Sequence, residues 1–163
     1  MNIVKSIEQL RDEIRPAKRH GTVVSLVPTM GYLHKGHLSL VSLAKQKSDH
    51  VIVSLFVNPA QFNDATDFEL YPRDFERDRQ VLHDAGVNTV FAPDVDVIYG
   101  DHFQTSIRLS SLAASFEGRS RPGHFEGMAT VVSILFNLVE PDLAIFGEKD
   151  FQQLRIIEQM VDD

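Results

Sequence analysis

Four short apolar runs, separated by stretches with helical patterning, constrain the fold of this chain more than any other feature. The runs cover residues 22–27, 51–57, 87–92 and 143–146. They are rich in β-branched residues, and the second is almost entirely apolar, as is typical of an inner parallel strand covered on both faces. Strands that alternate with helices at this spacing predict an α/β fold, with an open parallel sheet and helices on both faces.

Helix and turn signals assign most of the remaining residues. Ser6 and Gln9 form a capping-box pattern for a first helix, which follows directly on residues 1–5 and either stops before Pro16 or reaches Gly21. Further helices are expected over residues 36–47, 73–85, 110–116, 128–138 and 151–161. A short strand is expected at residues 105–109, with loops at residues 63–72, 93–100 and 117–127.

The stretch from Pro28 to His37 joins the first apolar run to the following helix. If that helix begins near Gly36, its free N–H groups and its positive dipole end meet at one spot, which favours an anion. His34 and His37 can both face this spot and donate hydrogen bonds to phosphate. The alternative is that they only complete the helix end. Neither the P-loop nor the G-x-G-x-x-G pattern is present, so a nucleotide site here is of another kind.

Polar residues elsewhere point to an acidic substrate. Asn58 and Gln61 follow the second apolar run, at the strand end where open α/β sheets bind ligands, although Asn58 can equally be a turn residue before proline. Residues 117–127 are rich in glycine and include Arg121 and His124. Arginine binds carboxylate or phosphate in bidentate fashion, and a surface salt-bridge loop is an equally weighted alternative.

Charged residues near two helix starts are candidates for binding a nucleotide or a metal ion. Residues 147–150 place a glycine and a helix N-terminus after a strand, with Lys149 to carry charge to a nucleotide. Glu148 and Asp150 alone are most simply acids at a helix start. Asp78 is a weak candidate for a magnesium ligand, since a solvated face with local ion pairs is favoured for its helix.

Four segments, taken in order along the chain, carry a family resemblance. They are Thr29-Met30-Gly31-x-Leu33-His34-x-Gly36-His37, residues 56–62 with residues 67–72, residues 118–127, and residues 146–153. Together they resemble the pantoate–β-alanine ligase (pantothenate synthetase) family, within the HIGH-type nucleotidylyltransferase superfamily. The resemblance implies a Rossmann-like sheet and the ATP-dependent condensation of pantoate with β-alanine through pantoyl adenylate. It implies Mg²⁺ with ATP and no tightly bound organic cofactor.

The resemblance also implies a role for each matching residue. His37, His34 and Lys149 are the implied catalytic residues, with His37 favoured as proton donor. ATP binding is implied for Met30, Gly31, Tyr32, Leu33, His34, Lys35, Gly36, His37, Gly147, Glu148, Lys149 and Asp150. Pantoate binding is implied for Pro28, Thr29, Met30, Asn58, Gln61 and Gln153. β-Alanine binding is implied for Gln61, Arg121 and His124.

Length and composition bound the remaining possibilities. The 163 residues suit one domain, and the net charge of −7 argues against non-specific nucleic-acid binding. The chain has no cysteine, which excludes a disulfide framework and thiolate metal sites. No signal peptide or membrane span is visible, so a cytoplasmic location is expected. The apolar helix at 128–138 is buried or in a subunit contact, and the resemblance implies a homodimer.

The family resemblance also sets an expectation about extent. Members continue into a smaller C-terminal domain that closes over ATP, so we expect residues 1–163 to be the N-terminal nucleotide- and pantoate-binding domain, with weak or no full activity. Two other functions stay open. One is a nucleotidylyltransferase acting on a phosphorylated acceptor, and the other is a non-catalytic binding module. The Gln61–Gln153 pair and the Arg121/His124 loop favour a carboxylate substrate over a phosphorylated one.

Overall fold

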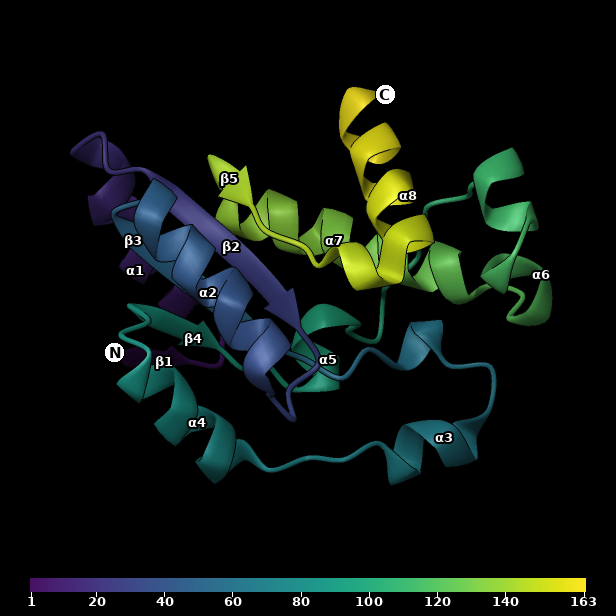
Figure 1. Cartoon of the computed structure of the whole chain (residues 1–163), viewed down its shortest axis with the longest axis horizontal. Helices are drawn as coiled ribbons and strands as arrows, with labels where there is room; N and C mark the ends of the chain where they lie inside the picture. The colour runs from purple at the N-terminus through teal and green to yellow at the C-terminus, as the bar shows by residue number, and fades with distance from the viewer.

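The computed structural model describes residues 1–163, and its five strands form a single parallel sheet (Figure 1). In spatial order the strands are β1 (Asn2–Val4), β4 (Thr89–Phe91), β3 (His50–Leu55), β2 (Val24–Thr29) and β5 (Leu143–Ala144). Every neighbouring pair is parallel, and β2 and β3 form the longest ladder, with Val24 opposite His50 and Thr29 opposite Leu55. The predicted open parallel sheet is confirmed.

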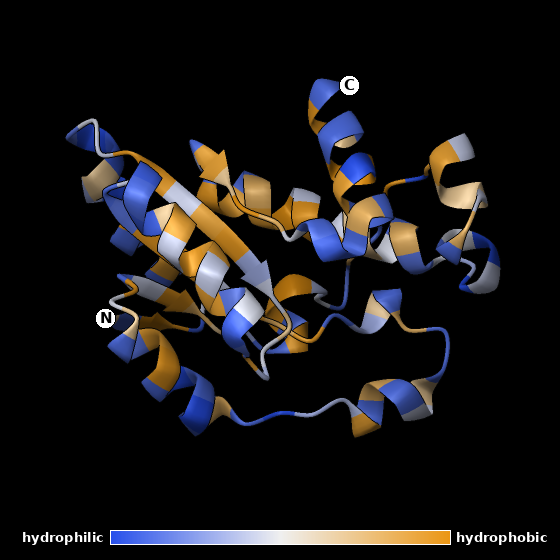
Figure 2. Cartoon of the chain, viewed as in Figure 1, coloured by the Kyte–Doolittle hydropathy of each residue, from blue (hydrophilic) through white to orange (hydrophobic).

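Helices cover both faces of this sheet. The helices α1 (Ile7–Arg19), α7 (His124–Val139) and α8 (Phe151–Asp162) contribute to one buried core, and α2 (Lys35–Lys47) and α4 (Phe75–Asp84) to the other. Neighbouring strand residues serve opposite cores, since Leu26 faces the first and Val27 the second. This alternation is what a strand buried on both faces requires. Figure 2 shows hydrophobic residues along β2 and along α7, which packs on the sheet.

The first helix follows its predicted start and ends between its two predicted stops, before Pro16 and at Gly21. The Ser6 hydroxyl accepts from the Gln9 N–H, and the Gln9 side chain accepts from the Ser6 N–H, so the capping box is confirmed. The helix continues through Pro16 and ends at Arg19. Leu10 and Ile14 are its buried residues, one turn apart, and they anchor it on the sheet.

Several predicted boundaries in the loops and at the N-terminus were wrong. The predicted loops contain short helices, namely α3 (Ala65–Leu70), α5 (Val95–Ile98) and α6 (Glu117–Ser120), and α7 begins at His124 rather than at residue 128. Residues 105–109 form no strand, and residues 111–114 form only a 3₁₀ turn, η2 (Ser111–Ala114). Residues 1–5 do not lead straight into a helix, because β1 precedes it. Four- to six-residue helices and a three-residue strand are too short to give a periodic signal.

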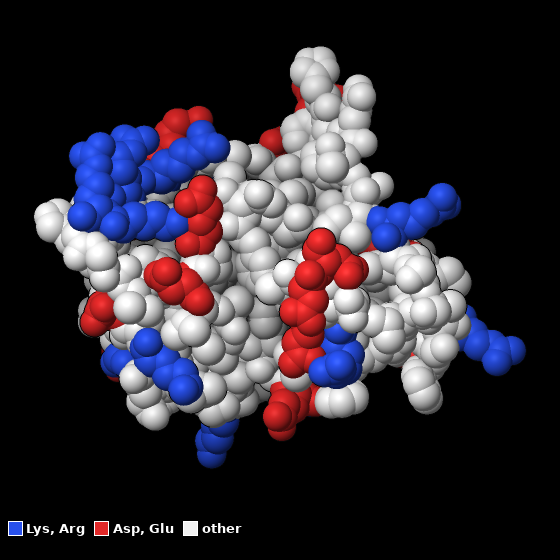
Figure 3. Space-filling view, turned by 90° about the horizontal axis from the view of Figure 1, so that it is seen from above, with Lys and Arg blue, Asp and Glu red and all other residues white.

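The surface carries separate groups of each charge. Basic residues occupy the last turns of α1 and α2, where positive charge complements the negative end of a helix dipole. Figure 3 shows a group of Lys and Arg at the left edge of the molecule and a separate group of acidic side chains near the centre. None of the helices combines the length and the apolar composition needed to cross a membrane.

The chain order places a topological switch point, where open α/β sheets have their ligand crevice, at the carboxyl ends of β2 and β5. From β2 the chain passes through α2 to β3 on one side, whereas β5 lies on the other side and leads into α8. The helices α2 and α8 that follow these two strands belong to opposite cores. Open α/β sheets bind ligands where successive connections diverge in this way. The turns after β2 and β5 therefore form the first place to search for a site.

Candidate active site

The histidine turn after β2 is closed by its own imidazoles. His34 is the N-cap of α2, and its Nδ1 accepts from the Gly36 N–H at 3.0 Å. The Nδ1 of His37 accepts in return from the His34 N–H at 3.2 Å. The two rings lie side by side, with centroids 4.1 Å apart. Both histidines thus complete the helix end, as the alternative interpretation held, and they do so with only one nitrogen each.

These contacts fix the tautomers of both rings. A ring nitrogen that accepts from a backbone N–H carries no proton, so a neutral imidazole in this position has its proton on Nε2. His34 is exposed and His37 is half-buried at the start of α2. Two N–H donors are thereby supplied at a helix N-terminus, the arrangement that favours a phosphate oxygen.

Charged groups on both sides of the site influence the pKa of His37. Burial lowers its pKa from the usual 6.5, and His34 lowers it further, while the carboxylates of Asp78 and Asp150 oppose the shift and Lys149 adds to it. The ring is therefore neutral near pH 7. This favours His37 as a hydrogen-bond donor through Nε2 rather than as a source of a proton. The influence of Asp150 and Lys149 also places the turn after β5 near this ring.

The backbone ahead of the histidines is unusual. Gly31 has φ +82° and Tyr32 has φ +50°, a left-handed conformation that a residue with a side chain rarely adopts. The Thr29 hydroxyl donates to the Ser54 carbonyl at 2.7 Å and accepts from the Gly31 N–H at 3.2 Å. The turn is therefore tied to β3 as well as to β2. Pro28 is half-buried in β2, and Lys35 is exposed at the first position of α2.

Gln61 lies where three segments meet. It ends the 3₁₀ turn η1 (Pro59–Gln61), and its Nε2 donates to the Met30 sulfur at 3.2 Å. Its Oε1 accepts from the Asn58 side chain at 3.0 Å. A Cβ on Gly127 of α7 would lie 2.0 Å from the Ala60 carbonyl oxygen, so α7 approaches η1 closely only because this residue is glycine. A closely packed scaffold thus holds Gln61 next to Met30, another of the implied pantoate contacts.

The Asn58 side chain is fully hydrogen-bonded within the protein and supports Gln61. Its Nδ2 donates to Gln61 and to the Gly127 carbonyl, both at 3.0 Å. Its Oδ1 accepts from the Ala60 N–H at 3.3 Å and from the Tyr99 hydroxyl at 2.7 Å. Burial raises the pKa of Tyr99 to about 12, so the phenol stays protonated and remains a donor. Because every polar atom of the amide is engaged, Asn58 orients Gln61 and has no group left for pantoate.

His124 carries its proton on the other ring nitrogen. Its Nδ1 donates to the Gln61 carbonyl at 2.7 Å, since a carbonyl oxygen only accepts. Burial lowers the pKa of His124, against the effects of this hydrogen bond and of Glu117. The neutral ring therefore has a free lone pair on Nε2. His34 and His37 can donate through Nε2, whereas His124 can accept there.

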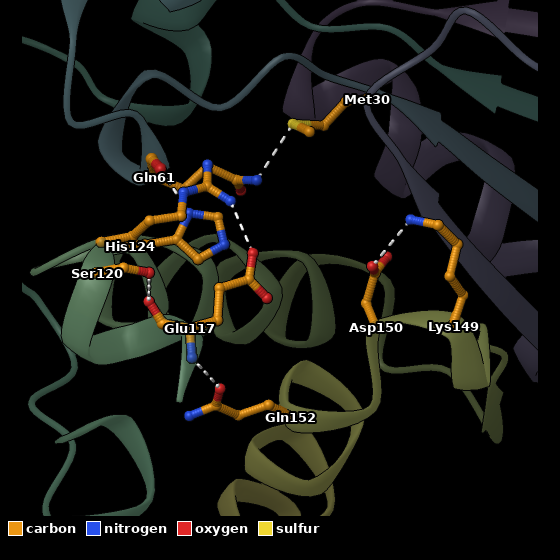
Figure 4. A network of polar contacts seen from close by, with 9 residues as sticks. Met30, Gln61, Glu117, Ser120, His124, Lys149, Asp150 and Gln152 are labelled. Atoms are coloured by element: carbon orange, nitrogen blue, oxygen red, sulfur yellow. Dashed lines mark hydrogen bonds and ion pairs between the residues drawn. The ribbon is translucent and has the colours of Figure 1, made fainter. Parts of the chain in front are cut away.

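The segment around α6 is fastened to α8. Arg121 donates to the Glu117 carboxylate at 3.0 Å, and the Glu117 N–H donates to the Gln152 side chain at 3.1 Å. Gln152 also donates to the carbonyls of Leu112 and Ser115. Figure 4 shows this network, with Glu117 and His124 across from Lys149 and Asp150.

The turn after β5 is exposed and contacts α2. The 3₁₀ turn η3 (Glu148–Asp150) carries Lys149, whose side chain is 86% exposed and lies 3.2 Å from Asp150. A Cβ on Gly147 would lie 3.9 Å from the Leu40 side chain, in ordinary contact with α2. Gln153 is half-buried in the first turn of α8. The predicted nucleotide residues after β2 and β5 are therefore neighbours across the sheet edge.

A separate cavity of about 330 Å³ lies at the carboxyl ends of β3 and β4. It shares Met30, Gly31 and Tyr32 with the histidine turn, but its lining includes neither His37 nor Gln61. The convergence of donors and acceptors lies in the open crevice by β2 and β5. We therefore place the candidate site in the crevice, with the cavity behind the turn.

The structure assembles no set of metal ligands around Asp78. Its carboxylate is 2% exposed and accepts from the N–H groups of Tyr32 and Leu33. No group of three or more His, Cys, Asp or Glu side chains is arranged to hold a metal ion. The sequence interpretation of Asp78 as a magnesium ligand thus finds no support, and the solvated face expected for its helix is wrong at this residue.

Sequence reasoning missed three residues of this region, namely Glu117, Gln152 and Tyr99. Each acts through contacts with residues 35 or more positions away, so no local pattern marks them. The only available signal was position, because Glu117 is the first residue of the glycine-rich stretch and Gln152 stands beside Gln153 in the sequence.

Comparison with known proteins decides the family. A family model described as pantoate-beta-alanine ligase matches residues 2–163. The chain belongs to the pantoate–β-alanine ligase family. The pantothenate synthetases of Brucella ovis and Brucella melitensis are 55% identical over all 163 residues, and the chain covers 56% of each of them.

Two solved structures of this family share the fold over the whole chain. A pantothenate synthetase from Thermus thermophilus is 48% identical with a TM-score of 0.95, and the chain covers 58% of it. A pantoate-beta-alanine ligase from Francisella tularensis, complexed with beta-gamma ATP and beta-alanine, is 43% identical with a TM-score of 0.96, and the chain covers 62% of it. The chain therefore spans little more than half the length of these relatives.

Proposed function

We propose that this chain takes part in the ATP-dependent condensation of pantoate with β-alanine through pantoyl adenylate. The observation that carries the proposal is the convergence of two Nε2–H donors, a helix N-terminus and the Met30–Gln61 pair at the carboxyl end of β2, in a member of this family. In the first step a pantoate carboxylate oxygen bonds to the α-phosphorus of ATP, and the bond to pyrophosphate breaks. In the second, the amine of β-alanine bonds to the acyl carbon and AMP leaves.

The nucleotide occupies the two turns in this proposal. Residues 30–37 and 147–150 border the nucleotide, and His34 and His37 donate to the phosphate on which negative charge develops. Lys149 is exposed, and its ammonium group is the proposed partner of that charge. The carboxylate is already a competent nucleophile, so alignment and charge stabilisation are the main demands on the protein.

Pantoate and β-alanine occupy the side of the crevice next to Gln61. Gln61 and Gln153 are the proposed pantoate contacts, together with Pro28, Thr29 and Met30. Arg121 is the proposed partner of the β-alanine carboxylate. β-Alanine is an ammonium ion at neutral pH and must lose a proton before it attacks. The free Nε2 lone pair of His124 suits it as the acceptor of that proton.

Mg²⁺ enters this account only with ATP. The residues of the chain do not assemble a set of metal ligands, so no step is assigned to a protein-bound metal ion. We also propose a cytoplasmic location, where ATP is supplied, and a homodimer. The homodimer rests on the family alone, since α7, the helix predicted to be buried or in a subunit contact, is largely buried inside this chain.

Pantoate-dependent exchange of labelled pyrophosphate into ATP tests the first step. We expect exchange that requires pantoate, and weak or no overall pantothenate synthesis from residues 1–163 alone. Exchange that ignores pantoate but responds to a phosphorylated acceptor would favour another nucleotidylyltransferase. Binding of ATP and pantoate without any exchange would favour a binding module.

A further inference from the structure

The turn that carries the histidine pair is hydrogen-bonded to a buried carboxylate from another helix. Asp78 of α4 accepts from the Tyr32 N–H at 2.6 Å through one oxygen and from the Leu33 N–H at 2.8 Å through the other. Its side chain is 3% exposed. A buried carboxylate is costly unless its oxygens are hydrogen-bonded, so these bonds are a requirement of the site and not an incidental contact.

The neighbouring, partly exposed Arg77 contacts the same two residues, Tyr32 and Leu33. Its Nη2 donates to the Leu33 carbonyl at 2.8 Å, and its guanidinium lies 5.3 Å from the centre of the Tyr32 ring. Its Nη1 lies 3.5 Å from the Asp78 carboxylate. Arg77 and Asp78 therefore engage both N–H groups and one carbonyl of the Tyr32–Leu33 pair, and we call them the Arg77–Asp78 clamp.

The turn needs such a clamp because its conformation is unfavourable by itself. Tyr32 has φ +50°, a left-handed conformation that is unfavourable for a residue with a side chain. A Cβ on Gly31 would lie 3.0 Å from the Asp78 carboxylate, so the approach of Asp78 depends on that glycine. His34 follows Leu33 directly, and its N–H is the donor that orients the His37 ring.

We propose that Asp78 and Arg77 are positioning residues, which hold the Tyr32–Leu33 turn so that the His34 and His37 rings present Nε2 to a phosphate. This role goes beyond any direct contact with substrate, and its functional meaning rests on the function proposed above. In this role the Asp78 carboxylate acts through the backbone N–H groups of Tyr32 and Leu33, and no metal ion is needed for it.

The decisive variant is Asp78→Asn, which keeps the shape but replaces one acceptor oxygen with an NH₂ group. We expect the Tyr32 and Leu33 amide protons to exchange with solvent at least about tenfold faster, and the ring ¹⁵N signals of His34 and His37 to shift. Arg77→Ala should produce a smaller change of the same kind. Asp84→Asn, at an exposed position of the same helix, is the matched control and should leave these signals unchanged.

ATP affinity distinguishes positioning from simple charge effects. Removing a negative charge near an anionic ligand should tighten ATP binding if Asp78 acts only through its field. If Asp78 acts by positioning, Asp78→Asn should instead weaken ATP binding by about tenfold, and the weakening should be the same with and without Mg²⁺. Tighter binding, or a loss seen only with Mg²⁺, would overturn the proposal.

The measurements also separate this inference from the proposed function. If the unaltered chain binds no ATP, the proposed function fails, and the amide exchange and ring signals still decide whether the clamp orients the histidines. If Asp78→Asn does not fold, Arg77→Ala carries the test. Unchanged exchange at Tyr32 and Leu33 together with unchanged histidine signals, in whichever of these variants folds, would contradict the clamp.

Discussion

At the residue scale, each imidazole of the histidine turn uses one ring nitrogen for a structural hydrogen bond and leaves the other for the proposed chemistry. The Nδ1 atoms accept from the backbone, and the Nε2 atoms are left to donate. One consequence is that stability and activity should respond differently to mutation. The ring of His37 contributes one exposed cap bond to the fold but a charge-assisted donor to the proposed transition state.

We therefore predict that His37→Ala folds normally and loses adenylate formation. A hydrogen bond to a charged group contributes about 1.5–3 kcal/mol, so the first step should slow by roughly 10- to 100-fold or more. Pyrophosphate exchange measures the rate, and a thermal melt measures the fold. His83→Ala, at an exposed position of α4, is the control. Unchanged exchange in His37→Ala would remove His37 from the mechanism.

At the element scale, the position of α6 depends on one side chain of α8. Gln152 accepts from the Glu117 N–H and donates to two carbonyls of the preceding turn. Phe116, just before α6, has φ +49° and is 87% exposed, so its own packing cannot hold this turn. Gln152 therefore contributes three hydrogen bonds that hold the segment carrying Arg121.

We predict that Gln152→Ala lowers the free energy of unfolding by roughly 1–3 kcal/mol and weakens β-alanine use more than ATP use. Urea unfolding gives the first quantity, and separate KM values give the second. Gln159→Ala removes a similar side chain from the same helix, where it bonds only to Asp163 at the exposed end, and serves as the control. Equal effects on both substrates would argue against a local role for Gln152.

The elements also show which parts of the fold local sequence can specify. Residues of β2 and β3 were predictable because long β-branched runs need burial on both faces, and the start of α1 because Ser6 and Gln9 satisfy each other's N–H groups. Residues 105–109 have a strand-like pattern, but they form no strand, and the Ile107 N–H donates to the Thr130 hydroxyl of α7. β1 was missed because only Val4 of its three residues is buried.

The site was predictable only where a motif is contiguous. His34, Gly36 and His37 act on one another within one turn, so their spacing carries the information. Asp78 accepts hydrogen bonds from Tyr32 and Leu33, which lie more than 40 residues away in the sequence. The Asn58 side chain is hydrogen-bonded to partners from two distant segments. No local pattern distinguishes a carboxylate that binds backbone from one that binds metal.

At the scale of the whole molecule, one buried histidine and two half-buried ones make stability depend on pH. Burial lowers the pKa of His37, His50 and His124 below the usual 6.5. The unfolded chain then binds protons more readily than the folded one, so stability falls as the pH drops below about 6.5 towards the lowered values. Glu8 and Glu140 also have lowered pKa values, but they act below 4.5, outside this window.

We predict a lower free energy of unfolding at about pH 5.5 than at about pH 7.5, measured by urea unfolding. His50, which contacts Thr89 away from the candidate site, isolates the effect from ligand binding. His50→Gln should reduce the slope with pH, whereas His83→Gln at the exposed position should not. Stability that is flat or rises on acidification would contradict the burial argument.

The central claim is that ATP and pantoate meet at the carboxyl ends of β2 and β5. Nuclear magnetic resonance of the ¹⁵N-labelled chain, titrated with ATP and then with pantoate, tests it most directly. We predict that ATP shifts the amides of residues 30–37 and 147–150 and the Nε2 signals of His34 and His37, and that pantoate then shifts the Gln61 and Gln153 side chains. Shifts confined to the cavity at β3 and β4, or to neither place, would contradict the account.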